Sequence, residues 1–340
     1  MAHPFVVVVG ASAGGVAALR RLAAGLPAGF QAPVLVVLHV GAHRSELPAL
    51  LSAAGPLPAK HANDGEIARS GQIYIAPPDH HMMIVAGRIR LTRGPRENFA
   101  RPAIDPLFRS AAEGFGPGAV GVILTGKLND GTVGLFEIKR RGGIAIAQDP
   151  NEAAYPDMPM SAATHVALDY CVPLEEIPKL LVELVASKER TMSDSHLTPA
   201  APDDRDVTYG GEFDRPVAVT CPDCGGALRR SESGSITKYA CHIGHAYTAE
   251  AMAEAQFSEL EKILGAAVRS LNERAEFCRQ MAERSPSLSP PDDDEPGWEA
   301  AGEQALDRAF TLRDFVEQGW IKPDAARGGA WRPEMMSREI

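Results

Sequence analysis

The segment Val6–Leu19, VVVVGASAGGVAAL, constrains the fold of this chain more than any other stretch. Its run of apolar, β-branched valines predicts a strand that is buried on both faces of a sheet. A glycine-rich turn and then a helical pattern follow directly. A buried strand that leads through a short turn into a helix favours an α/β fold with a mostly parallel, doubly wound sheet.

The turn, Gly10-Ala11-Ser12-Ala13-Gly14, fits the G-x-S-x-G pattern of a nucleophile elbow. Small residues let the backbone turn sharply, so that the Ser12 hydroxyl stands at the strand end beside its neighbours' N–H groups. Such donors at the start of a helix stabilise a developing oxyanion. The alternative is a phosphate-binding loop of the G-x-G-x-x-G type. It is disfavoured because Ser12 replaces the glycine that lets a pyrophosphate approach.

Two further strands predict partners for Ser12. The apolar run 34–38 ends on His39, and the run 119–124 leads into a polar loop that contains Asp130. Parallel strands end on one edge of a sheet, so these side chains share that edge. A nucleophilic serine needs a base, and the base needs an orienting group. Ser12, His39 and Asp130 therefore form a candidate triad, in a chain order that differs from those of the common serine hydrolases.

The other histidines and acids are interpreted as residues of loops, turns, helices or helix caps. They are His43, His61, His80, His81, His165, Asp64, Asp79 and Asp105.

The remaining pattern of the first half predicts alternating elements. Helices are expected over 16–25, 45–54, 104–115 and 132–141, strands over 144–148 and 166–172, and a further helix up to Ala186. Residues 60–91 contain short apolar runs broken by turns, which predicts an antiparallel insertion beside the main sheet. Its last two runs predict a hairpin across Ala86-Gly87.

Composition excludes several classes of protein. The formal net charge of -10 disfavours a general affinity for nucleic acid or for anionic membranes. No apolar run reaches the roughly 20 residues of a membrane helix, and the N-terminus does not resemble a signal peptide. We therefore expect a cytoplasmic protein without direct membrane insertion.

The 340 residues exceed one ordinary core, and the chain divides by composition. We expect a catalytic α/β domain over 1–187, a linker over 188–217, a zinc-ribbon-like module over 218–247, a helical hairpin over 248–320 and a tail over 321–340. The linker is polar and contains prolines. The hairpin is predicted from an apolar stripe at helical spacing over 248–284 and a second helical pattern over 298–318.

Cysteine spacing predicts a metal site in the small module. Cys221 and Cys224 form a C-x2-C turn, and Cys241 and His245 provide a second pair of ligands. Three thiolates and one imidazole suit a structural, tetrahedral Zn²⁺ with no open position. A redox pair is the weaker alternative for the C-x2-C turn, and His242 is the rival fourth ligand. The other two of the five cysteines, Cys171 and Cys278, are expected to be buried small apolar residues.

Several motifs in conserved order resemble the catalytic domain of the CheB family, the chemotaxis protein-glutamate methylesterases. They are VVVVGASAGG, VLVVLHV, DGEIARSGQIYIAPPDHHM, RPAIDPLFRSAA, GVILTGKLNDG and GGIAIAQDP. The resemblance covers about residues 5–186. It implies hydrolysis of glutamate γ-methyl esters in chemoreceptor helices with release of methanol, and many relatives also deamidate glutamines.

The resemblance assigns roles to individual residues. Ser12 is the nucleophile, His39 the general base and acid, and Asp130 the group that orients the imidazole. The backbone N–H of Ala13 is a candidate oxyanion donor. Arg101 is either a substrate-positioning residue or a member of an ordinary salt bridge.

The chain departs from the family pattern at three points. It begins at the elbow strand with no receiver domain, so we expect no control by phosphorylation in cis, and a separate receiver-domain protein or a methyltransferase is a candidate partner. Ala13 replaces a threonine that is usual in relatives, and Lys127-Leu128 places a cation near the acid. The last two departures motivate the alternative function, a non-catalytic signalling adaptor that uses the same fold to bind a receptor helix bundle. Some relatives without a receiver domain carry a similar cysteine-containing module.

Overall fold

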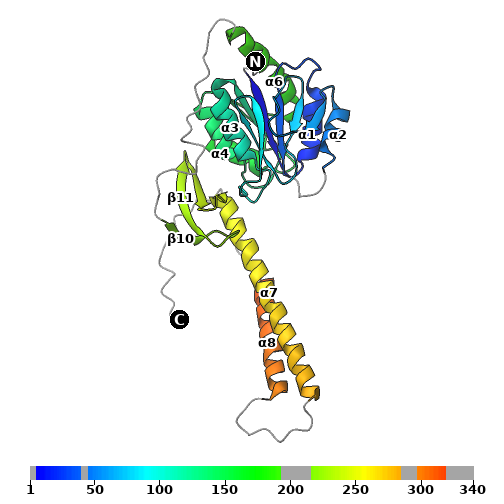
Figure 1. Cartoon of the computed structure of the whole chain (residues 1–340), viewed down its shortest axis with the longest axis vertical. Coiled ribbons are helices and arrows are strands. Elements are labelled where there is room, and N and C mark those ends of the chain that lie inside the picture. Colours follow the sequence, from blue (N-terminus) through cyan, green and yellow to red (C-terminus); the bar gives the residue numbers. More distant parts are fainter. Residues whose placement is uncertain (1–4, 40–44, 193–215, 285–296, 319–340) are drawn as a thin grey trace. The chain divides into compact units, whose positions relative to one another are not determined.

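The computed structural model describes residues 5–39, 45–192, 216–284 and 297–318 (Figure 1). They fall into two compact units, Met1–Met252 and Ala253–Ile340. The first unit holds an α/β domain and a small antiparallel sheet, and the second holds most of a helical hairpin. Of the linker predicted over 188–217, residues 193–215 lie outside the described residues, and its two ends belong to a helix that reaches Met192 and a strand that begins at Pro216. The predicted tail over 321–340 lies wholly outside the described residues.

The α/β domain is built on a seven-stranded sheet in which every neighbouring pair of strands is parallel. The strand order is β3-β4-β2-β1-β7-β8-β9, so β1 is the centre of the sheet and the strand order reverses there. This confirms the predicted doubly wound α/β fold. The strands are β1 (Val6–Ala11), β2 (Val34–Leu38), β3 (Ala59–His61), β4 (Ile73–Ile75), β7 (Ala119–Ile123), β8 (Ile144–Gln148) and β9 (Tyr170–Val172).

Helices cover both faces of this sheet (Figure 1). One face packs on α1 (Gly15–Gly25), α2 (Leu47–Ala54) and α6 (Ile177–Met192), and the other on α3 (Ile104–Phe115), α4 (Thr132–Arg140) and α5 (Asp157–His165). Short 3-10 turns cover Gly116–Gly118 and Leu174–Glu176. Alternate valines of β1 enter the two apolar cores, which is why the strand is apolar at every position.

The region 60–91 differs from its prediction. β3 and β4 are parallel members of the main sheet, because β4 pairs with β2. Only β5 (His81–Val85) and β6 (Arg88–Thr92) form an antiparallel pair. The predicted turn Ala86-Gly87 is confirmed, with φ of 49° and 73° at the two positions, as a tight hairpin requires. Short strands carry too little apolar alternation to reveal whether their partners are parallel.

The end of the α/β domain also differs from its prediction. The strand predicted over 166–172 is confined to β9, because Val166 ends α5 by donating its N–H to the Ala162 carbonyl. Asp169 then turns the chain, and its carboxylate accepts from the Ala145 N–H of β8.

His61 and His81 lie on strands rather than in loops, and His43 lies outside the described residues.

A four-stranded antiparallel sheet follows in the first unit. Its strands are β10 (Pro216–Thr220), β11 (Ala227–Ser233), β12 (Ile236–Cys241) and β13 (Ala246–Thr248). The β11–β12 turn contacts the α/β domain, where Ser235 bonds the His165 ring at 2.9 Å. We call residues 216–248 the cysteine module.

The helical hairpin consists of α7 (Ala249–Arg284) and α8 (Trp298–Glu317). Small residues let the two helices approach closely: a Cβ at Gly302 would lie 3.3 Å from the Cβ of Cys278. Cys278 is buried as predicted, whereas Cys171 is exposed at the edge strand β9. Within the described ranges, no helix is long and apolar enough to cross a membrane.

The contact between α3 and α4 predicts a sharp difference between two glycine substitutions. Gly134→Ala would place a Cβ 2.4 Å from the Phe108 Cβ, and this crowding should lower the free energy of unfolding by about 1–3 kcal/mol. Gly114→Ala meets no atom closer than 3.8 Å and should stabilise α3 by roughly 0.5–1 kcal/mol. Chemical denaturation of both variants measures the difference, and equal effects would contradict this packing.

Candidate active site

The elbow places Ser12 at the end of β1, between two elements that fix its backbone. The Ser12 N–H donates to the Thr125 carbonyl at 3.0 Å, and the Ser12 carbonyl accepts from the Gly15 N–H at 2.8 Å. Gly14 has φ of 74° and precedes the first residue of α1. A Cβ at Gly126 would lie 2.9 Å from the Ser12 Cβ, so the loop after β7 needs a glycine there. The predicted strand, turn and helix are all present.

Strand register brings Ser12 and His39 side by side. Ala11 and Leu38 are partners in the β1–β2 pairing, so the next residues of the two strands are neighbours. The His39 N–H donates to the Ala11 carbonyl at 3.2 Å, which extends the pairing beyond the last assigned pair. Adjacent strands lie about 4.8 Å apart, which is within reach of both side chains.

His39 and Asp130 form a direct contact. The His39 Nε2 lies 2.7 Å from Asp130 Oδ2. With Nε2 used in this way, Nδ1 is the ring nitrogen that remains to act on a hydroxyl. In the described part of the chain, no hydrogen bond joins the Ser12 hydroxyl to the His39 ring. Such contacts are often formed only when substrate is bound. The structure therefore joins two of the three predicted residues and places the third directly after the neighbouring strand β1.

Asp130 is a buried carboxylate with donors on both oxygens. Oδ2 also accepts from the Ile104 N–H at 2.6 Å, and Oδ1 accepts from the Asn98 amide at 2.9 Å and the Asp105 N–H at 3.4 Å. Burial by itself raises the pKa of Asp130, but the His39 bond and these donors outweigh it and lower the pKa below its ordinary value. Because two donors are first-turn N–H groups of α3, Asp130 also caps that helix.

Asp105 is a second buried acid beside the first. Its Oδ1 accepts from the Gly134 N–H of α4 at 2.7 Å, so this predicted cap residue caps the neighbouring helix. Burial and then the Asp130 charge raise the pKa of Asp105 to about 7. The two carboxyl groups therefore differ in their charge state near neutral pH: Asp130 is ionised, and Asp105 is partly protonated.

Three other predicted positions have defined surroundings. Among the described residues, the Ala13 N–H has no protein acceptor, so it is free to bind an oxyanion. The Arg101 guanidinium is occupied by Asp79, with contacts of 2.6 and 2.8 Å, and by the Gly94 carbonyl. This favours the salt-bridge interpretation of Arg101. The Lys127 ammonium lies 5.6 Å from the centroid of the Tyr155 ring and is not among the donors to Asp130.

Two residues of the site, Asn98 and its neighbour Glu97, belong to no sequence motif. Asn98 is 8% exposed, has φ of 47°, and joins Asp130 and Asp105 through its amide. Glu97 forms a two-point ion pair with Arg109 of α3, with distances of 2.7 and 3.0 Å. An asparagine in a loop is tolerant of positive φ, but nothing in the local sequence indicates its partners.

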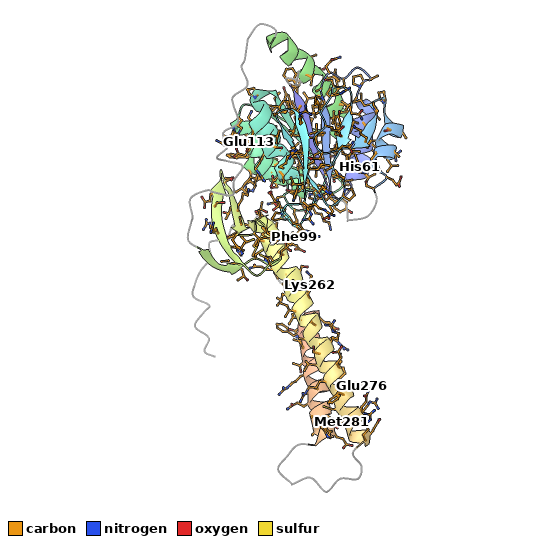
Figure 2. All side chains as sticks on the ribbon, in the orientation of Figure 1. His61, Phe99, Glu113, Lys262, Glu276 and Met281 are labelled. Carbon is orange, nitrogen blue, oxygen red and sulfur yellow. The ribbon has the colours of Figure 1, made fainter. Side chains whose placement is uncertain are left out.

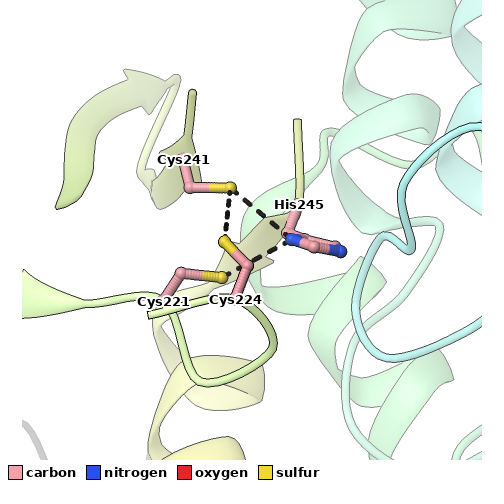
Figure 3. Close-up of side chains that lie close together, drawn as sticks. All are labelled: Cys221, Cys224, Cys241 and His245. Carbon is pink, nitrogen blue, oxygen red and sulfur yellow. Dashed lines mark hydrogen bonds between the residues drawn. The ribbon is translucent and has the colours of Figure 1, made fainter. Parts of the chain in front are cut away.

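The ligand atoms of Cys221, Cys224, Cys241 and His245 lie within 4.8 Å of one another (Figure 3). The individual distances are 3.6 Å between the Cys224 and Cys241 sulfurs, and 3.6 and 3.7 Å from His245 Nδ1 to the sulfurs of Cys241 and Cys221. The rival His242 is not part of the cluster, and its ring lies against Gly226 instead.

Comparison with known proteins identifies the family. A family model described as CheB methylesterase matches residues 7–181. The chain belongs to the CheB methylesterase family. A Leptospira interrogans protein is 39% identical over 180 residues, which cover 52% of this chain and 93% of that protein. The solved catalytic domain of Thermotoga maritima CheB methylesterase has 37% identity and a TM-score of 0.51, with 53% of this chain and 98% of that domain covered.

Longer relatives carry the same match on part of their length. An Anaeromyxobacter dehalogenans protein named protein-glutamate methylesterase/protein-glutamine glutaminase 3 is 45% identical over 161 residues, 46% of this chain and 47% of its own length. A Pyrococcus horikoshii protein with the same two activities in its name is 38% identical over 185 residues, 53% of this chain and 50% of its own length. This chain thus spans about half the length of these relatives, and the match covers the α/β domain.

The raised pKa of Asp105 predicts a pH dependence of stability. Between about pH 4 and 7 the folded state holds a proton on Asp105 that the unfolded state has lost. As the pH rises through this range, the free energy of unfolding should therefore fall by up to roughly 1.4 kcal/mol per pH unit. In Asp105→Asn this contribution is absent. Urea denaturation at several pH values should therefore give curves that diverge for the two proteins, and parallel curves would contradict the assignment.

Proposed function

We propose that this chain is a serine hydrolase that demethylates glutamate γ-methyl esters of chemoreceptor helices and deamidates glutamines at such positions. The observation that carries the proposal is the His39–Asp130 contact of 2.7 Å beside Ser12, in a chain of the CheB methylesterase family. The names of the relatives support both activities. Residues Ser12, His39 and Asp130 act as nucleophile, base and orienting acid.

The first half of the reaction transfers the acyl group to the enzyme. The Ser12 oxygen attacks the γ-carbonyl carbon of the ester while its proton passes to Nδ1 of His39. Ionised Asp130 holds Nε2–H and stabilises the imidazolium that forms. The carbonyl oxygen becomes an oxyanion, for which the free N–H of Ala13 is a donor. Collapse of this intermediate breaks the C–O bond, and His39 returns the proton to the leaving methoxide, which departs as methanol.

The second half regenerates the enzyme. Water attacks the acyl carbon, His39 accepts a proton from it, and the bond to the Ser12 oxygen breaks with return of that proton to the serine. The products are glutamate and free enzyme. With a glutamine substrate the same steps release ammonia instead of methanol, because the leaving nitrogen takes the proton from His39.

Substitution of Ser12 tests the proposal. Ser12→Ala should lower methanol release from methylated receptor by at least about 1,000-fold, because no nucleophile remains, and its far-UV spectrum and Tm should match those of the wild type. Asp130→Asn should lower kcat by a comparable factor. Full turnover by Ser12→Ala would refute the mechanism. Failure of the wild type to react with a fluorophosphonate serine probe would favour the adaptor function instead.

We also propose that the cysteine module holds a structural Zn²⁺. A tetrahedral site with Zn–S bonds of about 2.3 Å and a Zn–N bond of about 2.0 Å has ligand separations of about 3.5–3.8 Å. The three ligand separations of 3.6 to 3.7 Å given above fit this geometry. Gly225, directly after Cys224, and Gly244, between Cys241 and His245, have φ of 68° and 104° and permit the tight turns at the two ligand pairs. Four protein ligands leave no open position, so the ion would have no part in the hydrolysis itself.

Metal analysis tests the zinc proposal. Wild-type protein from zinc-supplemented medium should contain about one Zn²⁺ per chain by plasma mass spectrometry. Cys224→Ser should lose most of it because one of the ligands is weakened. Cys171→Ser is the matched control, since that cysteine lies outside the cluster. Equal zinc in both variants, or none in the wild type, would refute the site.

A further inference from the structure

The cysteine module contacts the α/β domain beside the candidate triad. Phe99 lies at the edge of the α/β domain near this contact (Figure 2), and its ring packs edge-on against Tyr247 of β13 with centroids 5.4 Å apart. The backbone of the loop is also paired with β13. The Asn98 N–H donates to the Ala246 carbonyl at 2.8 Å, and the Ala246 N–H donates to the Arg96 carbonyl at 3.3 Å. The loop around Asn98 therefore pairs with β13 through backbone hydrogen bonds, as a short neighbouring strand would.

Asn98 connects β13 to the catalytic carboxylate through one side chain. Its Oδ1 accepts from the Thr248 N–H at 3.0 Å, and its amide nitrogen donates to Asp130 at 2.9 Å. Both ends of the amide are thereby fixed, and Asn98 and Thr248 are both buried. A rotation of the amide would break a bond at each end. The position of β13 therefore determines the shorter of the two hydrogen bonds that Asp130 accepts on Oδ1, the oxygen that does not contact His39.

A second asparagine repeats this connection. Asn129, the residue before Asp130, accepts from the Thr248 hydroxyl at 2.7 Å and donates to Glu250 at 2.6 Å. The loop that carries Asp130 is therefore held by the last residue of β13 and by a residue in the first turn of α7. All of these side-chain contacts lie within the first compact unit.

The metal ligands lie at the other end of the same strand. His245 directly precedes β13, and its carbonyl accepts from the Cys241 N–H at 3.0 Å. The Tyr247 hydroxyl lies 3.6 Å from the Cys221 sulfur and donates to Asp223 at 2.6 Å. An ion bound by four ligands would therefore fix both the start of β13 and the ring that packs on Phe99.

We propose that the cysteine module is a structural part of the active site, in which bound metal fixes β13, β13 fixes Asn98, and Asn98 positions the Asp130 carboxylate toward His39. Asn98 is a positioning residue, because it acts through Asp130. The proposal rests on the proposed hydrolase function and deepens it, since it makes the rate of the chemical step dependent on the metal site. Loss of the metal lowers kcat, with little effect on KM.

The test measures methanol release from methylated receptor by the zinc-loaded full chain, before and after chelation. Asn98→Ala should lower kcat by about 10- to 100-fold, the effect of losing one hydrogen bond to a charged group. Chelation should lower wild-type kcat by a similar factor but should add little to the loss in Asn98→Ala, because both changes break the same series of contacts. Fully additive losses, or a wild-type kcat that chelation leaves unchanged, would overturn the proposal.

Ser235→Ala is the matched control. It removes the Ser235–His165 bond, which joins the same module to the α/β domain away from Asn98. This variant should keep the wild-type kcat and the wild-type response to chelation. A loss equal to that of Asn98→Ala would show that any weakening of the module contact suffices, and the role of Asn98 would be refuted.

Asn98→Asp separates positioning from folding if Asn98→Ala is unstable. It keeps the acceptor for the Thr248 N–H and the shape of the side chain but replaces the donor to Asp130 and to the neighbouring acid Asp105 by a carboxylate. Its zinc content should equal that of the wild type. Its kcat relative to the wild type should rise as the pH is lowered, since protonation of the new group restores a donor. A constant ratio across pH would overturn the positioning role.

Amide hydrogen exchange gives a readout that is independent of activity. Chelation should accelerate exchange of the Asn98 and Thr248 amides by at least about tenfold relative to amides of β1, because local opening then costs less free energy. If the wild type releases no methanol, the proposed hydrolase function fails, and hydrogen exchange alone then tests whether bound metal fixes β13 and Asn98. Unchanged exchange of these amides after chelation would overturn that link.

Discussion

The structure of the active site depends on one buried carboxylate, that of Asp130. It accepts hydrogen bonds from His39, from the Asn98 amide and from the first N–H groups of α3. Each donor comes from a different segment of the chain or from a helix terminus that would otherwise be unsatisfied. A charge buried in this way is costly unless it is fully bonded. The carboxylate therefore requires β2, α3 and the Asn98 loop to be in place together.

The neighbouring acid shows how environment separates two chemically identical groups. Asp130 receives donors on both oxygens and stays ionised, whereas burial and the charge of Asp130 raise the pKa of Asp105 to about 7. Each of the two carboxyls also caps a helix that begins near the site. Asp130, in the loop before α4, caps α3, and Asp105 of α3 caps α4. Close packing at Gly134 maintains this arrangement.

Much of the fold and part of the site could be predicted from local sequence. The valines of β1 reveal a strand buried on both faces, and the glycines around Ser12 reveal the turn into α1. The placement of His39 and Asp130 follows from the rule that parallel strands end on one edge of the sheet. The prediction failed for β3 and β4, whose three-residue strands carry no periodicity, and for the exposed Cys171. Arg101 had two open interpretations, and its contacts with Asp79 favour the structural one.

The sequence by itself determined the strand–turn–helix of the elbow, the residues that end the neighbouring strands and the ligand types of the cysteine cluster, because each is encoded by spacing over a few residues. Spacing also favoured His245 over His242 as the fourth ligand, and His245 is the histidine of the cluster. Only the tertiary structure decided that Asn98 joins Asp130 to Thr248. These contacts join residues far apart in the chain, and local spacing carries no information about them.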